Sequence, residues 1–148
     1  MINVVDIQKI LPHRFPFLLI DRVEEMEAGK HVKAYKNVTI GEQIFQGHFP
    51  GHPIYPGVMI IEGMAQAGGV LAFMSMNNDE QKNTEEKVVY FMSIDRAKFR
   101  MPVTPGDKLV YNLEVLKHKG NIWVLDAKAY VDDKLVAEAE LKAMVVDK

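Results

Sequence analysis

The fold is decided by residues 58–76, which read VMIIEGMAQAGGVLAFMSM. The segment has no proline and is rich in Met, Ala and Leu, which are good helix formers. Only Glu62 and Gln66 are strongly polar, and their spacing of four places them on one helix face. A helix that is apolar all round is a core helix or a membrane span. Because this one contains Glu62 and three glycines, and has no second span beside it, we predict a helix buried inside a soluble fold.

The preceding segment, residues 40–57, reads IGEQIFQGHFPGHPIYPG and contains three prolines and four glycines. Proline lacks a backbone donor and glycine is conformationally free, so we expect no helix or central strand at this density. The sequence predicts an ordered loop or a rigid extended segment, which can fix a side chain without a helix.

The rest of the chain is rich in strand patterns. We expect strands at residues 17–27, 31–39, 88–94, 108–118, 122–131 and 134–146, with a further short strand at 97–101. In the last strand the odd-numbered residues from Leu135 to Val145 are predicted to face inward. The last three strands are consecutive and joined by short turns, which predicts an antiparallel sheet.

One long apolar helix and five to six strands predict an α+β fold, in which a curved sheet wraps around the helix. A chain of 148 residues suits one domain, which we expect to span residues 1–148. Any face of the helix that the sheet leaves open would need a partner subunit.

Composition excludes several classes of protein. The absence of cysteine excludes disulfide scaffolds, thiolate zinc sites and cysteine nucleophiles. The net charge of −2 argues against binding to nucleic acid, which needs a strong positive field. The N-terminal stretch MINVVDIQKILPH lacks the features of a signal peptide, so we expect a cytoplasmic protein.

Three titratable residues of this apolar and rigid region are candidates for a functional role: His48, His52 and Glu62. A histidine in a rigid loop suits a general base near neutral pH, and the alternative for His48 is a structural hydrogen bond to the loop. His48 and His52 have the i, i+4 spacing of a metal-binding helix, but the prolines around them exclude that helix. We therefore expect no metal site and a bracing role for His52.

Glu62 lies one turn into the apolar helix. A buried carboxyl group is either paired or keeps its proton, and a neutral carboxyl is a competent general acid; the alternative is an interaction with the helix dipole. Gln66 can orient Glu62 or satisfy a backbone group. Gly57 opens the helix and offers its N–H to an oxyanion. This combination indicates proton removal next to a carbonyl with loss of a leaving group.

The runs GHFPGHP at residues 47–53, PGV at 56–58 and IEGMAQAGG at 61–69 closely resemble the 3-hydroxyacyl-[acyl-carrier-protein] dehydratases of type II fatty-acid synthesis, the FabZ type. Nearly the whole chain is covered, since further short motifs look like the same family, at residues 11–14, 16–22, 94–95, 98–100, 102–103 and 105–107. One departure is Gly63, where many relatives have Ala.

The resemblance implies a hot-dog fold and a dimer with composite active sites, usually assembled into a trimer of dimers. It implies His48 as the base and Glu62, from the neighbouring subunit, as the acid, with the Gly57 amide at the thioester oxygen. The substrate would be a (3R)-hydroxyacyl chain on acyl carrier protein, and the product a trans-2-enoyl thioester for fatty-acid and lipid A biosynthesis. No cofactor is implied.

Further contacts with the substrate are expected from Phe49, Val58, Tyr90 and Gln66. Carrier protein is acidic, so a basic docking surface is expected as well. Arg96, Lys98 and Arg100 recur at every second position and are predicted on one strand face, for which plain solvation is the alternative.

Three other functions are weighed against dehydration. A dehydratase that also isomerises its product to the cis-3 isomer is the nearest, although its relatives carry Asp at the acid position, so that Glu62 favours dehydration alone. A hot-dog thioesterase would hydrolyse the thioester instead. A non-catalytic acyl carrier would bind without turnover.

Overall fold

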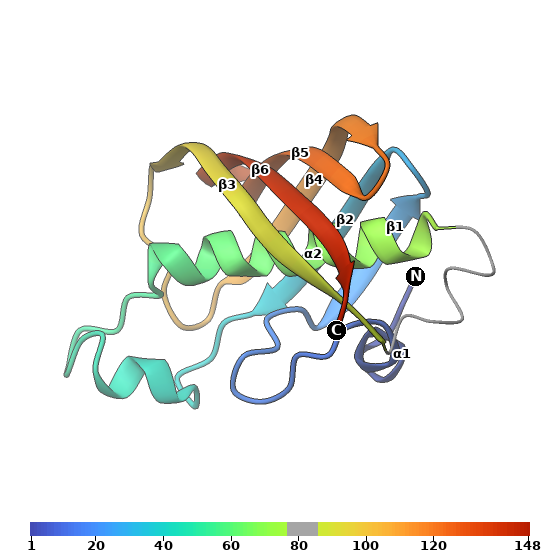
Figure 1. The fold of residues 1–148 in the computed structure, drawn as a ribbon. Helices are drawn as coiled ribbons and strands as arrows, with labels where there is room; N and C mark the ends of the chain where they lie inside the picture. The colour runs from blue at the N-terminus through green and yellow to red at the C-terminus, as the bar shows by residue number, and fades with distance from the viewer. Residues whose placement is uncertain (77–85) are drawn as a thin grey trace.

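The computed structural model describes residues 1–76 and 86–148 (Figure 1). Its elements, in chain order, are α1 (Val4–Ile10), β1 (Arg22–Glu27), β2 (His31–Asn37), the 3₁₀ helix η1 (Gln43–Gln46), α2 (Gly57–Met74), β3 (Lys87–Phe99), β4 (Lys108–Lys119), β5 (Ile122–Val131) and β6 (Lys134–Asp147). The predicted long helix and the last three predicted strands are confirmed, with ends that differ by one or two residues.

The six strands form one antiparallel sheet in the order β1-β2-β4-β5-β6-β3, so that β1 and β3 are its edges. Figure 1 shows the sheet curving around α2, which runs across its inner face. The helix contacts the four central strands β2, β4, β5 and β6. The predicted α+β architecture, a sheet wrapped around one helix, is therefore confirmed.

α2 is a core helix. By length and composition alone it would pass as a membrane span, but 72% of its residues are buried inside the fold. Its glycines admit side chains of the sheet: a Cβ at Gly68 would lie 2.6 Å from Leu125, and one at Gly63 would collide with the Tyr111 hydroxyl. Close packing of this kind explains why small residues recur along an otherwise bulky helix.

The predicted strand at residues 17–27 is wrong in its first half, because β1 begins only at Arg22. The backbone of the earlier residues is bonded elsewhere. The Leu19 N–H donates to Oε1 of Gln66 at 2.8 Å, and the Phe17 carbonyl accepts from Nε2 of Gln66 at 2.7 Å. A side chain of α2 thus takes the place of a neighbouring strand, a contact that no local pattern reveals.

Three further expectations need correction. The strands predicted at 88–94 and 97–101 form one strand, β3, with irregular pairing between Phe91 and Ser93 and between Asp95 and Lys98. A register shift between β5 and β6 makes Val136, rather than Leu135, the buried residue. A short 3₁₀ helix, η1, forms in the segment where no helix was expected, because it precedes the first of the prolines.

The edge strand β3 carries a row of apolar side chains that are exposed in the single chain: Tyr90, Phe91, Met92, Ile94 and Phe99. An open strand edge with apolar side chains is a surface on which another chain can add.

Candidate active site

His48 is held by the loop between η1 and α2. Its N–H donates to the Ile44 carbonyl at 3.0 Å, and its carbonyl accepts from the Ile54 N–H at 3.1 Å. Its ring Nδ1 lies 2.6 Å from the Ile54 carbonyl oxygen. A carbonyl only accepts, so in the neutral ring Nδ1 carries the proton and Nε2 keeps its lone pair. The sequence left two roles open for His48, a general base and a structural hydrogen bond to the loop. The bond from Nδ1 to the Ile54 carbonyl is of the second kind, and it leaves Nε2 available for the first.

Glu62 lies on α2 with 22% of its side chain exposed. Its Oε1 accepts a hydrogen bond from Nε2 of Gln66 at 3.1 Å, and Nε2 of His13 lies 3.7 Å from the same oxygen. Gln66 is almost fully buried and also bonds the backbone of Phe17 and Leu19. The two roles weighed for Gln66, orienting Glu62 and satisfying backbone groups, are thus both present in its contacts.

A cavity of about 210 Å³ opens beside Glu62. Its lining combines that carboxyl and the Gln66 amide with mostly apolar side chains: Leu11, Pro12, His13, Ala65, Gly69, Phe73, Val89, Tyr90 and Phe91. An apolar cavity with a few converging polar groups is typical of a site for a small apolar ligand. Tyr90, a predicted substrate contact, is part of the lining, whereas His48 is not. The candidate base His48 and the candidate acid Glu62 therefore do not share this cavity in the single chain.

The N-terminus of α2 lies at a second cavity of about 410 Å³. Gly57 and Val58 line it together with Phe99 of β3. A Cβ at Gly57 would lie 2.7 Å from the Phe99 ring, so only glycine allows this close approach. Val58 is strongly exposed, and Phe49 is exposed with its ring stacked on His48 at 4.0 Å between centroids. Gly57, Val58 and Phe99 thus lie beside the start of α2, where the first N–H groups of a helix have no partner within it.

The three basic residues predicted for docking lie near the end of β3, in a less regular arrangement than the spacing suggested. Arg96 lies at the irregularity in β3, with a positive φ of 51°, and Arg100 follows the last residue of the strand. Both are ion-paired with β6: Arg96 with Glu140 at 2.7 Å and Arg100 with Glu138 at 2.9 Å. These carboxylates offset part of the positive charge that a docking surface would use.

His52 is exposed and lines a separate, largely apolar cavity with Ile40 and several prolines. Within residues 1–76 and 86–148, no group of three or more His, Asp or Glu side chains is placed to hold a metal ion. Sequence reasoning gave no role to His13, which the structure places beside Glu62. The only signal for it was its place in the LPHR motif, because 49 residues of sequence separate it from Glu62.

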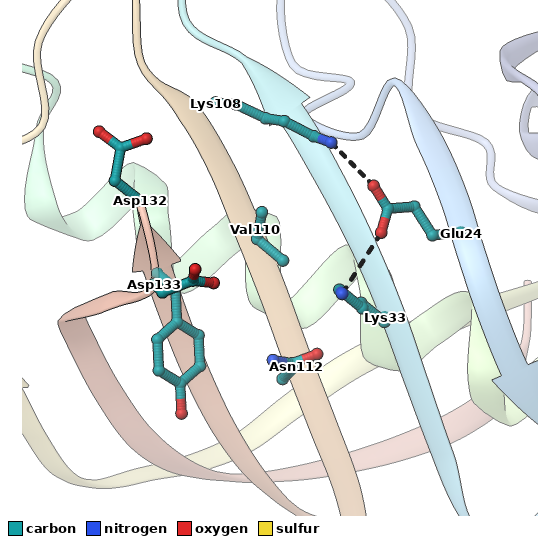
Figure 2. A pocket seen from close by; sticks show the side chains of 8 residues that line it. Glu24, Lys33, Lys108, Val110, Asn112, Asp132 and Asp133 are labelled. Carbon is teal, nitrogen blue, oxygen red and sulfur yellow. Dashed lines mark hydrogen bonds and ion pairs between the residues drawn. The ribbon is translucent and has the colours of Figure 1, made fainter.

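A fourth cavity, of about 400 Å³, lies on the outer face of the sheet and is lined mostly by polar side chains. Figure 2 shows Glu24 between two lysines, with Lys108 at 2.9 Å and Lys33 at 3.5 Å. Each of these charges is already matched by a neighbour. The ion pairs of Glu24 therefore join adjacent strands.

Comparison with known proteins identifies the family of this chain. The family model of the FabA-like domain matches residues 11–140. The chain is 79% identical over 148 residues to the 3-hydroxyacyl-[acyl-carrier-protein] dehydratase FabZ of Campylobacter curvus, covering 100% of both chains. Among solved structures, it resembles the dehydratase heterocomplex ApeI:P from Xenorhabdus doucetiae, with a TM-score of 0.77 and 18% identity over 96% of this chain and 91% of that chain.

A hot-dog-like protein from Thermanaerovibrio acidaminovorans is also similar, with a TM-score of 0.63 and 17% identity over 83% of this chain and 85% of that chain. At such low identity the solved structures show the fold alone, which is the expected hot-dog fold. The chain belongs to the FabA-like domain family and, within it, to the FabZ-type 3-hydroxyacyl-[acyl-carrier-protein] dehydratases.

Proposed function

We propose that this chain is a hydro-lyase that converts (3R)-hydroxyacyl-[acyl-carrier-protein] to the trans-2-enoyl thioester in type II fatty-acid biosynthesis. The observation that carries this proposal is the 79% identity, over the full length of both chains, to a FabZ dehydratase. The reaction removes a proton from C2 and a hydroxyl from C3, which together leave as water.

His48 acts as the base. Its Nδ1–H donates to the Ile54 carbonyl, so the lone pair of Nε2 is free to take the proton from C2. The thioester carbonyl accepts from the Gly57 N–H at the start of α2, which stabilises the negative charge that develops on the carbonyl oxygen. The close approach of the Phe99 ring keeps the Gly57 end of the site apolar.

Glu62 acts as the acid. It donates its proton to the departing C3 hydroxyl, and water leaves as the C2–C3 double bond forms. His48 then holds one additional proton and Glu62 has lost one, so proton exchange restores both groups before the next turnover. The apolar lining of the cavity beside Glu62 suits the acyl chain.

The active site is composite, with His48 from one subunit and Glu62 from its partner. Two observations support this arrangement: Glu62 and His48 do not line a common cavity in the single chain, and the β3 edge carries exposed apolar side chains. The dimers assemble further into a trimer of dimers. The enzyme works in the cytoplasm, and it docks acidic carrier protein near Arg96, Lys98 and Arg100.

The reverse reaction provides the test. Purified protein is given a trans-2-butenoyl thioester, and the loss of conjugated enoyl absorbance is followed with free thiol monitored in parallel. We expect absorbance to fall without release of thiol, and His48→Ala and Glu62→Gln to abolish the change. His52→Ala is the matched control, since this exposed histidine lies in the same loop and should leave the rate nearly unchanged.

Other outcomes would reassign the function. Release of thiol would indicate a thioesterase, and formation of a cis-3 product would indicate the bifunctional isomerase. Binding without turnover, even with a carrier-protein substrate, would indicate an acyl-chain carrier and contradict the proposal.

A further inference from the structure

His13 lies in the segment between α1 and β1 and lines the cavity beside Glu62. Its ring stacks on Phe17, with 6.4 Å between centroids. Its Nδ1 is buried and has no hydrogen-bond partner within the described residues. Its Nε2 lies 3.7 Å from Oε1 of Glu62. A partly buried, stacked imidazole beside the proposed acid is one titratable group that the mechanism above does not use.

The ring proton of His13 belongs on Nε2. A buried N–H without an acceptor is costly, and no acceptor faces Nδ1, so the tautomer with its proton on Nε2 is favoured. That tautomer directs a neutral N–H at Glu62. The separation of 3.7 Å exceeds a hydrogen bond, and such contacts often tighten when substrate closes a site.

The partly buried position of His13 favours its uncharged form. Desolvation lowers its pKa below the ordinary value, opposed by the Glu62 carboxylate and assisted by the neighbouring Arg14. Tyr90, from β3, is the other titratable group that lines this cavity. Protonation of the ring would add an N–H at Nδ1, which is buried and has no acceptor within the described residues.

Both contacts to Glu62 reach the same oxygen. Gln66 donates from its amide nitrogen to Oε1, and His13 approaches Oε1 as well. In the protonated acid that the proposed function requires, contacts from these donors at Oε1 leave Oε2 as the oxygen that carries the proton. Within the described residues Oε2 has no hydrogen bond and is free to meet a substrate hydroxyl.

We propose that His13 is a positioning residue for the dehydration. As a neutral donor it works with Gln66 to hold Oε1 of Glu62, so that the acidic proton stays on Oε2 and points to the leaving hydroxyl. The proposal deepens the proposed function and rests on the acid role of Glu62 stated there.

Three substitutions of the same site provide the test. His13→Phe keeps a ring that can stack on Phe17 and removes both nitrogens, while His13→Gln restores a neutral donor and His13→Met has similar length without a donor. Each is assayed with the butenoyl thioester, and its folding is checked by thermal melting. The matched control is His118→Phe, because His118 is also a stacked imidazole, on Trp123, and lies outside the site.

We expect His13→Phe and His13→Met to lower kcat at least about tenfold, in line with loss of one donor at a reacting group, with little change in KM. His13→Gln should recover part of the loss. In a Glu62→Asp background, where the shorter side chain withdraws from His13, His13→Phe should cause little further loss. If His13 had only a structural role, His13→Phe would lower kcat by the same factor in the wild-type and Glu62→Asp backgrounds.

Three results would overturn the inference: kcat within about twofold of wild type for His13→Phe, a loss confined to KM, or losses that multiply with Glu62→Asp. If His13→Phe does not fold, equal kcat for the Gln and Met variants overturns it. Full activity of Glu62→Gln would remove the acid role itself. Loss of activity in Glu62→Gln with wild-type kcat in His13→Phe would leave the proposed function standing alone.

Discussion

At the scale of single residues, Gln66 connects the packing of the fold to the site. Its carbonyl accepts from the Leu19 N–H, and its amide donates to both the Phe17 carbonyl and Glu62. One buried side chain on α2 therefore fixes the segment before β1 and orients the proposed acid. Its effects on folding and on catalysis are separable by measuring both.

We predict that Gln66→Leu lowers the free energy of unfolding by about 1–3 kcal/mol, because it leaves the buried Leu19 N–H without a partner. Urea unfolding at pH 7 measures this change. Gln46→Leu is the control, since Gln46 is exposed on η1 and should change stability by less than about 0.5 kcal/mol. Equal stability of the two variants would mean that Leu19 finds another acceptor.

At the scale of elements, the close contact between α2 and β4 depends on Gly63. Tyr111 of β4 is fully buried, and its hydroxyl donates to the Leu19 carbonyl at 3.1 Å. Burial raises the pKa of this hydroxyl well above its ordinary value, so it remains a donor. A Cβ at position 63 would collide with it, and a side chain held on all sides has little room to move.

Gly63→Ala should therefore destabilise the protein by about 1–3 kcal/mol, although Ala is the better helix former. In a Tyr111→Phe background the same change should cost less, because the colliding hydroxyl is gone. Thermal melting of the four proteins in this cycle measures the coupling. Gly41→Ala is the control, since its added Cβ would make only an ordinary contact at 3.8 Å. Stabilisation by Gly63→Ala would contradict the packing described here.

The outer faces of β1, β2 and β4 are joined by Glu24 (Figure 2). The hydrogen bond from Lys108 is the main cause that holds the pKa of Glu24 below its ordinary 4.5. A lowered carboxyl pKa stabilises the fold above the ordinary pKa, and this stabilisation is lost as the pH falls through the folded-state value. The pairs are near the surface, so the effect is below about 1 kcal/mol.

Glu24→Gln should therefore melt slightly below wild type at pH 7, and the difference should vanish near pH 3. Melting temperatures measured across this range test the sign. Glu25→Gln changes the neighbouring exposed residue and should show no such pH-dependent difference. A difference that grows in acid would exclude the stabilising ion pair.

At the scale of the whole molecule, the proposed composite site makes a prediction that a single-chain site does not. His48→Ala and Glu62→Gln proteins, each inactive alone, are mixed at equal amounts, unfolded and refolded together. A dimer of one chain of each kind has one site with intact His48 and Glu62. Random pairing therefore restores about one quarter of the wild-type sites.

The recovered hydration rate of the mixture, compared with refolded wild type, measures this fraction. Refolding each variant by itself is the control and should restore nothing. No recovery in a mixture that forms mixed dimers would place both residues of a site on one chain.

Much of the fold follows from local sequence. The apolar run 58–76 predicted α2, and the alternating segments after residue 108 predicted β4, β5 and β6, because side-chain periodicity depends only on neighbours along the chain. The resemblance in residues 47–69 predicted the family. Local patterns failed where a distant group competes for the backbone, as Gln66 does at residues 17–19, and where pairing shifts register, as at Leu135.

The sequence by itself determined the core helix and the last three strands and named the candidate base and acid, since these depend on residue type and spacing. Only the tertiary structure decided the tautomer of His48, through the Ile54 carbonyl, and the approach of His13 to Glu62. It also decided that Gly63 faces the Tyr111 hydroxyl. Each of these contacts depends on which groups the curved sheet and the loops bring together from distant positions in the sequence. The spacing of residues along the chain does not reveal such contacts.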